Sequence, residues 1–344
     1  MRLLIYNRQS NNVNTTANTR EGEHDQRLNR SDLAILSAVA RFHYLTAYQT
    51  NRLVFPGCHD GFRYARRRLA RLVEAGFLLR LKPLSVPHRG AAAHVFTLAT
   101  AGRRLLGLQH RSFRPNEEQE KAGNLPFLEH TLATIDVLIA AELLCRTAPV
   151  SMPRLLVERE LRAHPVRVQL VSRDGTQHRS VAVIPDAWFE LAVGDQRPVA
   201  IAVELDRGSE DQKRWRAKVE ALAAWALGPY REAFGAETLT IATVTPTAAR
   251  REQLRTWTAQ ELSRIGQPAL GEIFLFTSAD PVTTSPRTFL FGRCWFEPVA
   301  PEPVSLLFPP VLPPSAVVGL DMERRGDGRK QAQEPGSPVL TADR

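Results

Sequence analysis

Acidic residues stand near both ends of one apolar stretch, VIPDAWFELAVGDQRPVAIAVELDRGSE, which covers residues 183 to 210. Asp186 follows a proline, and Glu204 and Asp206 close the second apolar run. Hydrolysis of a phosphodiester uses a divalent cation, which neutralises developing charge and makes hydroxide available from water. Mg²⁺ prefers hard oxygen ligands such as carboxylates. The stretch therefore indicates a metal-dependent catalytic site with Asp186 and Glu204 as ligands.

These carboxylates converge only if the stretch folds into a β-hairpin. The sequence VGDQRP between the apolar runs supplies Gly194 and Asp195, residue types that favour tight turns. Pairing of the flanking strands then sets Asp186 against the segment from Glu204 to Asp206. The carbonyl of Leu205 becomes available as a further oxygen ligand.

Ordinary structural roles would explain the same acids. Asp186 could be a turn residue at a strand end, Glu204 one half of an ion pair, and Asp206 the cap of a helix that begins near Ser209. Glu204 favours a metal site, because it directly follows VAIAV, a run typical of a buried strand. A carboxylate in such a place requires a partner.

A predicted amphipathic helix at residues 125 to 146 carries three more polar candidates. Glu129 and Asp136 are weaker candidates for completing the site, because surface helices routinely carry acids. We expect His130 to pack or to form a hydrogen bond rather than to bind metal, since no second histidine stands at ligand spacing.

Positive charge is concentrated in one part of the chain. The 344 residues carry a net charge of +9, but residues 28 to 114 alone hold 15 lysines and arginines against 3 acids, a net charge of +12. Such a local field favours a polyanionic partner, here double-stranded DNA. The start of the chain lacks a signal-peptide core, and no run approaches the length of a membrane span, so we expect a cytoplasmic protein that does not enter membranes.

The basic segment has the element order of a winged helix. We predict a helix capped by Asn29 or Ser31, a second helix capped by Thr46, and a third from Asp60 to Gly76. Two strands follow, at residues 77 to 81 and 94 to 99. In a winged helix the third helix enters the major groove of DNA.

The third helix is rich in arginine. Its periodicity turns Phe62, Ala65, Leu69, Leu72 and Val73 inward and gathers the arginines on other faces. A solvated charged face is the plain alternative, but few acids are present to balance the cations. We therefore predict that DNA is bound by five residues: Arg63, Arg66, Arg67, Arg68 and Arg71.

The remainder of the chain predicts a mixed α/β sheet. Strand-like segments begin near residues 154, 166, 179 and 198, and are followed by a helix, a strand, a second helix and a last strand. The early strands form hairpins and the later ones are joined by helices, as in a mixed sheet. The quoted hairpin falls at its centre.

Four blocks carry a resemblance to known proteins: HVFTLATAG, EHTLATIDV, PDA and VELDRGSE, in this order. The stretch from IPDAWFEL through KRWRAKVEALAAW resembles the core of the PD-(D/E)XK nuclease superfamily. The whole layout from Asp32 to Phe296 resembles the replication-relaxation family. The resemblance implies a winged helix joined to a restriction-endonuclease-like domain, encoded on plasmids or other mobile elements, with a role in relaxing or opening DNA at replication.

One residue departs from the superfamily pattern. The pattern has a lysine two residues after the glutamate, but this chain has Asp206. Some superfamily members carry the lysine on the next helix, where Lys218, or less favourably Lys213, stands here. Asp206 could then serve as a third ligand. We expect Asp186, Glu204, Asp206 and Lys218 to form the catalytic set, with Mg²⁺ as cofactor.

The sequence thus predicts an α+β protein with five parts: an arm at 1–27, a winged helix-turn-helix domain at 28–108, a linker at 109–124, a mixed α/β restriction-endonuclease-like domain at 125–298, and a proline-rich polar tail at 299–344. It leaves open whether the protein cleaves DNA or is a catalytically silent regulator or relaxosome accessory protein. Replication or relaxosome proteins would be its partners. A homodimer would suit duplex DNA, although no residue pattern demonstrates one.

Overall fold

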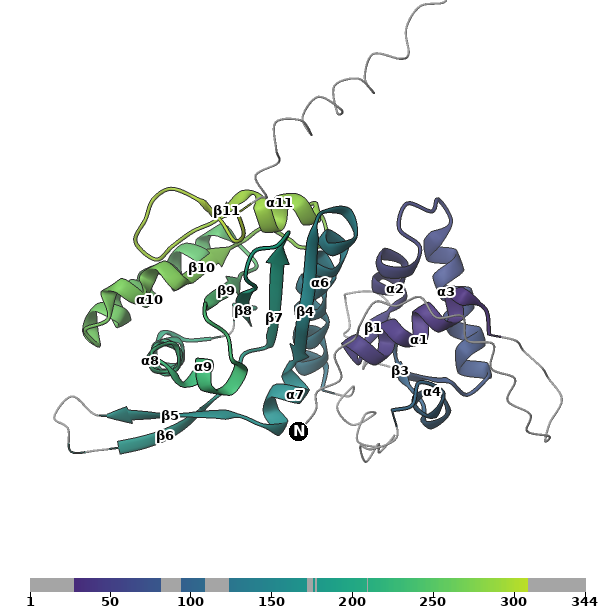
Figure 1. Ribbon diagram of the computed structural model, residues 1–344, viewed down its shortest axis with the longest axis horizontal. Coiled ribbons are helices and arrows are strands. Elements are labelled where there is room, and N and C mark those ends of the chain that lie inside the picture. Colours follow the sequence, from purple (N-terminus) through teal and green to yellow (C-terminus); the bar gives the residue numbers. More distant parts are fainter. Residues whose placement is uncertain are drawn as a thin grey trace, which may run out of the picture. The chain divides into compact units, whose positions relative to one another are not determined.

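Helices and a mixed β-sheet make up the computed structural model, which describes residues 28–81, 94–108, 124–171, 176, 178–208 and 210–308 (Figure 1). The fold is α+β, as predicted. The arm at 1–27, the loop between the two predicted strands, residues 109–123 of the linker and the tail beyond Phe308 lie outside the described residues. Everything described belongs to one compact unit that extends to Phe308.

Three helices open the described chain: α1 (Arg30–Phe42), α2 (Ala47–Val54) and α3 (Gly61–Glu74). Asn29 caps α1 and Thr46 caps α2, each in a capping box that satisfies free backbone N–H groups. Gly76 ends the α3 segment with a φ of +73°, which glycine adopts without steric cost. Phe62, predicted to face inward, is instead 46% exposed, and the buried face of α3 is formed by Gly61, Ala65, Leu69 and Leu72.

A small antiparallel sheet follows, in the order β1-β3-β2. It consists of β1 (Leu45–Thr46), β2 (Leu78–Leu81) and β3 (Val95–Leu98), after which α4 (Thr100–Leu105) begins. The predicted sequence of three helices and two strands is present. The sequence did not indicate β1, because two residues cannot display an alternating pattern. The identification as a winged helix stays a prediction.

The long helix α6 (Leu125–Thr147) lacks the predicted amphipathic pattern. No residue from 127 to 145 is exposed. The helix contacts α2, α11 (Pro286–Phe291) and strands of the sheet, and its acidic residues Glu129, Asp136 and Glu142 are half-buried. Among the described residues, no helix is both long and apolar enough to cross a bilayer.

The main sheet is mixed, as predicted, with five strands in the order β10-β9-β8-β7-β4. Antiparallel pairs join β4, β7 and β8, whereas β8, β9 and β10 run parallel. The strands are β4 (Val150–Val157), β7 (Ala187–Val193), β8 (Val199–Leu205), β9 (Thr240–Val244) and β10 (Phe274–Thr277). The segment between Val193 and Val199 closes the predicted hairpin.

Helices cover both faces of this sheet (Figure 1). Alternate side chains of β8 point to opposite faces, so Ile201 and Val203 pack in the core that contains α6, whereas Ala200 and Ala202 join the core on the other side. That second core includes α8 (Gln212–Ala226) and α10 (Ala248–Arg264). Trp215 and Trp225 of α8 are fully buried there.

Two predicted strands are divided differently in the structure. Residues 158 to 160 begin α7 (Glu158–Ala163) instead of extending β4. The predicted continuous strand from residue 179 is broken at Ile184–Asp186 into β6 (His178–Val183) and β7. Pro185 lacks the N–H that a ladder requires, so β6 pairs with β5 (Val166–Val171) in a separate ribbon.

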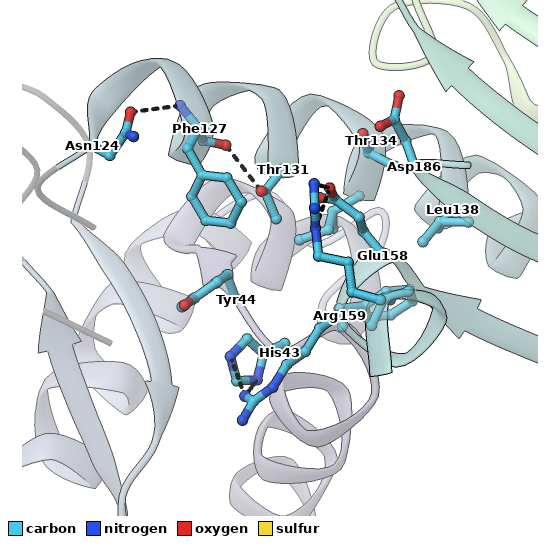
Figure 2. Close-up of a pocket in the computed structure, with 14 residues that line it drawn as sticks. His43, Tyr44, Asn124, Phe127, Thr131, Thr134, Leu138, Glu158, Arg159 and Asp186 are labelled. Carbon is cyan, nitrogen blue, oxygen red and sulfur yellow. Dashed lines mark hydrogen bonds and ion pairs between the residues drawn. The ribbon is translucent and has the colours of Figure 1, made fainter. Parts of the chain in front are cut away.

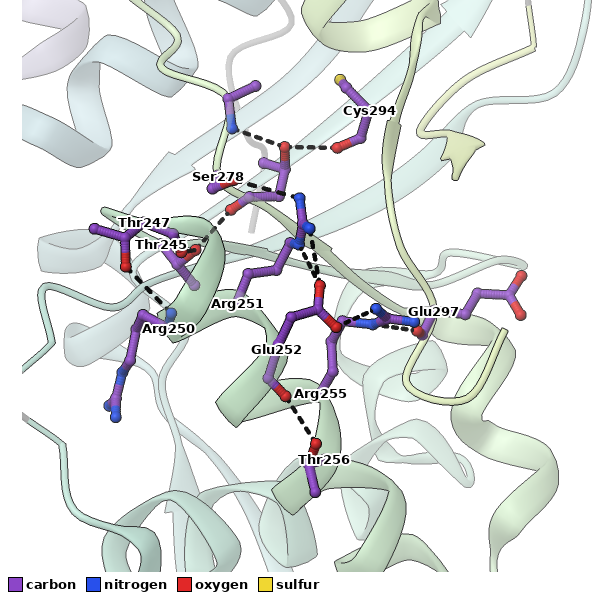
Figure 3. Close-up of polar contacts among 12 residues, drawn as sticks. Thr245, Thr247, Arg250, Arg251, Glu252, Arg255, Thr256, Ser278, Cys294 and Glu297 are labelled. Carbon is purple, nitrogen blue, oxygen red and sulfur yellow. Dashed lines mark hydrogen bonds and ion pairs between the residues drawn. The ribbon is translucent and has the colours of Figure 1, made fainter. Parts of the chain in front are cut away.

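Several short elements complete the unit: α9 (Pro229–Phe234), the 3₁₀ helix η1 (Pro268–Ile273), β11 (Arg293–Trp295) and β12 (Val304–Ser305). The segment after β11 is held by α10. Arg255 is 8% exposed and donates to the carbonyl of Glu297 at 2.7 Å (Figure 3). It also donates to the carbonyl of Ala300 at 2.5 Å. Leu306 and Leu307 are buried, so packed chain continues beyond residue 298.

Candidate active site at the ends of strands β7 and β8

The hairpin brings Asp186 beside the end of β8, as predicted. Ala187 is in register with Val203, and the Asp186 N–H donates to the carbonyl of Val203 at 2.9 Å. The Asp186 carboxylate accepts a hydrogen bond from the Leu205 N–H at 2.7 Å. Leu205 thus meets Asp186 through its N–H, whereas the sequence suggested a role for its carbonyl.

Glu204 is 3% exposed and has the partner that its burial requires. Nζ of Lys218, on α8, lies 3.1 Å from Glu204 Oε2 and 2.6 Å from Glu210 Oε1. The predicted reach of Lys218 back over the sheet is therefore present. Lys213, the less favoured alternative, is exposed on the first turn of the same helix.

The charges of this site alter each other's protonation. Burial raises the pKa of Glu204 to about 7, although Lys218 opposes the shift. Burial lowers the pKa of Lys218, but the charges of Glu204, Asp186 and Glu210 outweigh burial and raise it above its usual value. Lys218 is consequently a permanent cation at neutral pH, suited to donate hydrogen bonds and not to abstract protons.

His130 completes the contacts of Asp186. Its Nε2 lies 2.9 Å from Asp186 Oδ1, which confirms the expected hydrogen-bonding role. Burial lowers the pKa of His130, but the hydrogen bond to Asp186 and the charge of Asp186 outweigh it, so the pKa is raised. His130 is therefore positioned to fix the orientation of the Asp186 carboxylate.

The other acids of α6 are engaged elsewhere. Glu129 pairs with Arg207 at 2.6 Å. Asp136 pairs with Arg52 of α2 at 2.8 Å, and the same arginine donates to the carbonyl of Pro281 at 2.8 Å. These contacts join α6 to neighbouring elements, so neither acid completes the site around Asp186.

Asp206 is held on both oxygens. Its side chain is 1% exposed and accepts hydrogen bonds from Nε and Nη2 of Arg250 at 2.7 and 2.9 Å. Arg250 lies in the first turn of α10, which Thr247 caps (Figure 3). The alternative that Asp206 caps the next helix is wrong, because Asp211 accepts the capping hydrogen bond of α8.

Asp186 and Glu204 form a donor set of two carboxylates. Among the described residues, no group of three or more His, Cys, Asp or Glu side chains is arranged to hold a metal ion. Mg²⁺ is commonly bound through one or two protein carboxylates, with water and substrate phosphate as its other ligands. Asp186 and Glu204 supply the type of oxygen ligand that this mode uses, and the charge of Asp186 acts on Glu204, but two carboxylates do not make a closed structural zinc site.

A pocket of about 320 Å³ opens next to Asp186 (Figure 2). Phe42, His43 and Tyr44, at the end of α1, line one side of it, and Phe127 and Leu138 of α6 are part of another. His43 has a φ of +70°, and this turn carries the chain from α1 into the pocket wall. The pocket was not predicted, because its walls come from segments far apart in the chain.

The five arginines predicted to bind DNA lie in different environments. Arg63, Arg66 and Arg67 are exposed, and the Arg67 guanidinium lies 4.8 Å from the centre of the exposed Tyr64 ring. Arg68 is 14% exposed and pairs with buried Asp32 of α1 at 3.0 Å. Arg71 is half-buried. Tyr64 was not singled out from the sequence, where it fell within the arginine run.

A model of the replication-relaxation family matches residues 36–233, a range that includes α2, α3, the hairpin and Lys218. No curated protein and no solved structure matches the chain.

Proposed function

This chain belongs to the replication-relaxation family, and from that premise we propose that it binds duplex DNA through α3 and nicks or cleaves it at Asp186 and Glu204 with Mg²⁺. The family supports a role in the replication or relaxation of plasmid or other mobile-element DNA. The proposed partners are double-stranded DNA and proteins of the replication or relaxosome machinery.

The observation that carries the proposal is the contact between Glu204 and Lys218. A buried glutamate lies at the end of a central strand, 3.1 Å from a lysine of the following helix. The charge of Asp186, which directly precedes the paired strand, acts on this glutamate, and together these features support a PD-(D/E)XK-type site with a relocated lysine. Replacing both partners of such a buried ion pair with apolar residues usually costs little stability. Function therefore explains the buried charges of Glu204 and Lys218 better than stability does.

The roles of the residues follow from their contacts. Asp186 and Glu204 would hold Mg²⁺, which when bound would supply positive charge to the phosphate and acidify a water molecule. Lys218, a permanent cation, would donate a hydrogen bond to the attacking water or to the phosphate oxygens. His130 would keep the Asp186 carboxylate in place through their 2.9 Å contact.

DNA binding is supported by the exposed arginines of α3. Arg63, Arg66 and Arg67 provide cations for phosphates or guanine edges. The order of α1, α2, α3, β2 and β3 supports a winged helix, in which α3 would enter the major groove. Arg68 is better assigned to packing, because it neutralises buried Asp32.

The test is incubation of supercoiled plasmid with the purified full chain and Mg²⁺ or Mn²⁺. We expect open-circular or linear product with the unmodified protein and loss of that product with Asp186→Asn, Glu204→Gln and Lys218→Met, while all variants shift the plasmid equally on a gel. Plasmid that is bound but stays intact with either ion would overturn the proposed cleavage.

A second candidate is a DNA-binding regulator or relaxosome accessory protein that does not cleave. The pair between Asp206 and Arg250 favours it, because an acid clamped on both oxygens stands where the superfamily pattern has its lysine. The same plasmid experiment separates the candidates, since only the regulator leaves bound plasmid uncut.

A further inference from the structure

The pocket beside Asp186 has no role in phosphodiester hydrolysis as described above. Its wall includes Asp186 itself, so a ligand in the pocket would lie next to a proposed metal ligand (Figure 2). A DNA strand whose phosphate reached Asp186 and Glu204 would carry its adjacent base and sugar into the same neighbourhood. The occupant of the pocket is therefore expected to belong to the substrate.

The lining is mainly aromatic and aliphatic. Phe42, Tyr44 and Phe127 contribute rings, and Ile135 and Leu138 contribute aliphatic surface. Figure 2 shows Phe127 and Tyr44 on opposite sides of the space, one from α6 and the other from the segment after α1. Nucleobases bind to such surfaces, because every nucleobase presents a π-face that stacks on aromatic side chains.

The uncharged polar side chains of the lining include two threonines and one asparagine. Thr131 and Thr134 donate their hydroxyl protons to the carbonyls of Phe127 and His130, which leaves their oxygens as acceptors. Asn124 accepts from the Phe127 N–H through Oδ1, so its amide NH₂ is the group that faces outward as a donor. A small number of donors and acceptors around an apolar space suits a ring with a polar edge.

Charge in the lining is balanced. Arg162 pairs with Glu158, and Arg159 lies 2.9 Å from His43 Nε2. With Asp186 also in the wall, the pocket favours a neutral ring over a phosphate or a carboxylate. Nucleobases are neutral at physiological pH, whereas their phosphates would stay outside, near the proposed metal ligands.

We propose that this pocket binds one unpaired nucleobase of the DNA strand that is cut, so that the substrate of the site is single-stranded or locally opened DNA. The inference rests on the proposed function, and it names the substrate class of the same site. A base in a duplex would have to leave its stack to enter, which costs free energy that an already unpaired base does not spend. Opened DNA is therefore preferred over closed duplex.

The test uses photocrosslinking in EDTA, which prevents cleavage. A short fluorescein-labelled oligodeoxynucleotide with one 5-iododeoxyuridine is irradiated with the full chain, either single-stranded or annealed, and the crosslinked peptide is identified by mass spectrometry. We expect attachment at Phe127 or Tyr44 with the single strand and little with the duplex. Attachment only outside the pocket, or equal attachment with both forms, would overturn the proposal.

Matched variants of one lining residue provide the second readout. Thr131→Phe would fill the pocket and weaken binding of the single strand about tenfold by fluorescence anisotropy, whereas Thr131→Ala, which leaves the space open, would retain it. Full binding by a folded Thr131→Phe protein would contradict the proposal. The crosslink of the unmodified chain decides the matter if Thr131→Phe does not fold.

Glu204→Gln separates this inference from the proposed function, because Glu204 does not line the pocket. Crosslinking at Phe127 or Tyr44 that persists in this variant, with no cleavage by the unmodified chain under Mg²⁺, supports the base pocket and overturns the nuclease. Cleavage of single-stranded DNA that Thr131→Phe leaves unchanged overturns the pocket and keeps the nuclease.

Discussion

Asp206 and Glu204 lie two residues apart, yet their carboxylates are held in opposite ways. Asp206 is bound on both oxygens by Arg250 at 2.7 and 2.9 Å, and that guanidinium also donates to two uncharged groups, the Gln253 amide oxygen and the Glu210 carbonyl. Glu204 shares the single ammonium of Lys218 with Glu210, and the charge of Asp186 acts on the same lysine. One acid is fully matched by a cation, whereas three acids converge on one lysine.

This difference separates scaffold from candidate chemistry. A matched and desolvated pair is electrically neutral and fixes two elements relative to each other, as Asp206 and Arg250 fix the end of β8 to α10. A site with surplus negative charge attracts a cation and raises the pKa of its buried acid. The pKa of Glu204 is raised by burial first, and also by the charges of Asp186 and Glu210. The balance of charge around each acid, more than the number of acids, indicates where Mg²⁺ would bind.

The largest effect is expected from breaking the matched pair. Asp206→Ala leaves the Arg250 guanidinium, 11% exposed, without its carboxylate, and we expect a loss of about 3–5 kcal/mol in the free energy of unfolding. Chemical denaturation of the full chain measures it. The double variant Asp206→Ala/Arg250→Met should lose much less, because both charges are gone. Equal losses in single and double variants would contradict a scaffold role for the pair.

Glu204→Gln should behave in the opposite manner. We expect cleavage of DNA to fall at least 100-fold, about 2.7 kcal/mol, because a charged ligand is lost, while the free energy of unfolding changes by less than about 1 kcal/mol. Stability is little affected, since Lys218 keeps its contact with Glu210. Nicking rates and denaturation curves of the same preparation check both statements. A variant that is strongly destabilised would place Glu204 with the scaffold acids.

The sequence alone indicated much of this site, because the decisive signals are local. A proline before Asp186, a turn at Gly194 and a glutamate within a β-branched run predict the hairpin and the need for a partner of Glu204. Lys218 follows within the next helix, so it too could be named. The hairpin and the contact between Glu204 and Lys218 are both present in the structure.

What could not be predicted depends on contacts between distant segments. Arg250 binds Asp206 from 44 residues away, and nothing near Asp206 in the chain announces it. The half-burial of the acidic residues of α6 follows from packing by α2, α11 and the sheet, which periodicity within α6 cannot report. The pocket beside Asp186 has the same origin, since its walls come from α1, α6 and α7.

The pair of Asp136 and Arg52 sharpens the comparison through pH. Burial raises the pKa of Asp136 from 3.8 to about 6, and Arg52 offsets only part of this shift. The folded state therefore binds the proton more tightly than the unfolded state, so the stabilising contribution is complete below about pH 4 and is lost as pH rises through 6. This difference between the folded and unfolded pKa values of Asp136 corresponds to about 3 kcal/mol in the free energy of unfolding.

Denaturation of the unmodified chain and of Asp136→Asn between pH 4 and 7 measures this contribution, because asparagine does not titrate. We expect the unmodified chain to lose stability relative to the variant as pH rises. The opposite slope would mean that Arg52 matches Asp136 completely, as Arg250 matches Asp206.

The smallest expected effect extends the comparison to cations. Arg67 and Arg68 are neighbours on α3, but Arg67 is exposed beside Tyr64, whereas Arg68 neutralises buried Asp32.

If exposed cations serve DNA and matched cations serve the fold, Arg67→Ala should weaken duplex binding by about 1 kcal/mol and reduce the slope of log K against log salt by about 1, with unfolding unchanged. Arg287→Ala, an exposed arginine on α11, is the matched control and should leave the slope as it is. Arg68→Ala should instead lower the free energy of unfolding, because it leaves the Asp32 carboxylate buried without its cation. Equal salt slopes for Arg67→Ala and Arg287→Ala would show that duplex DNA approaches another surface, and the distinction between exposed and matched charge would then hold for the acids alone.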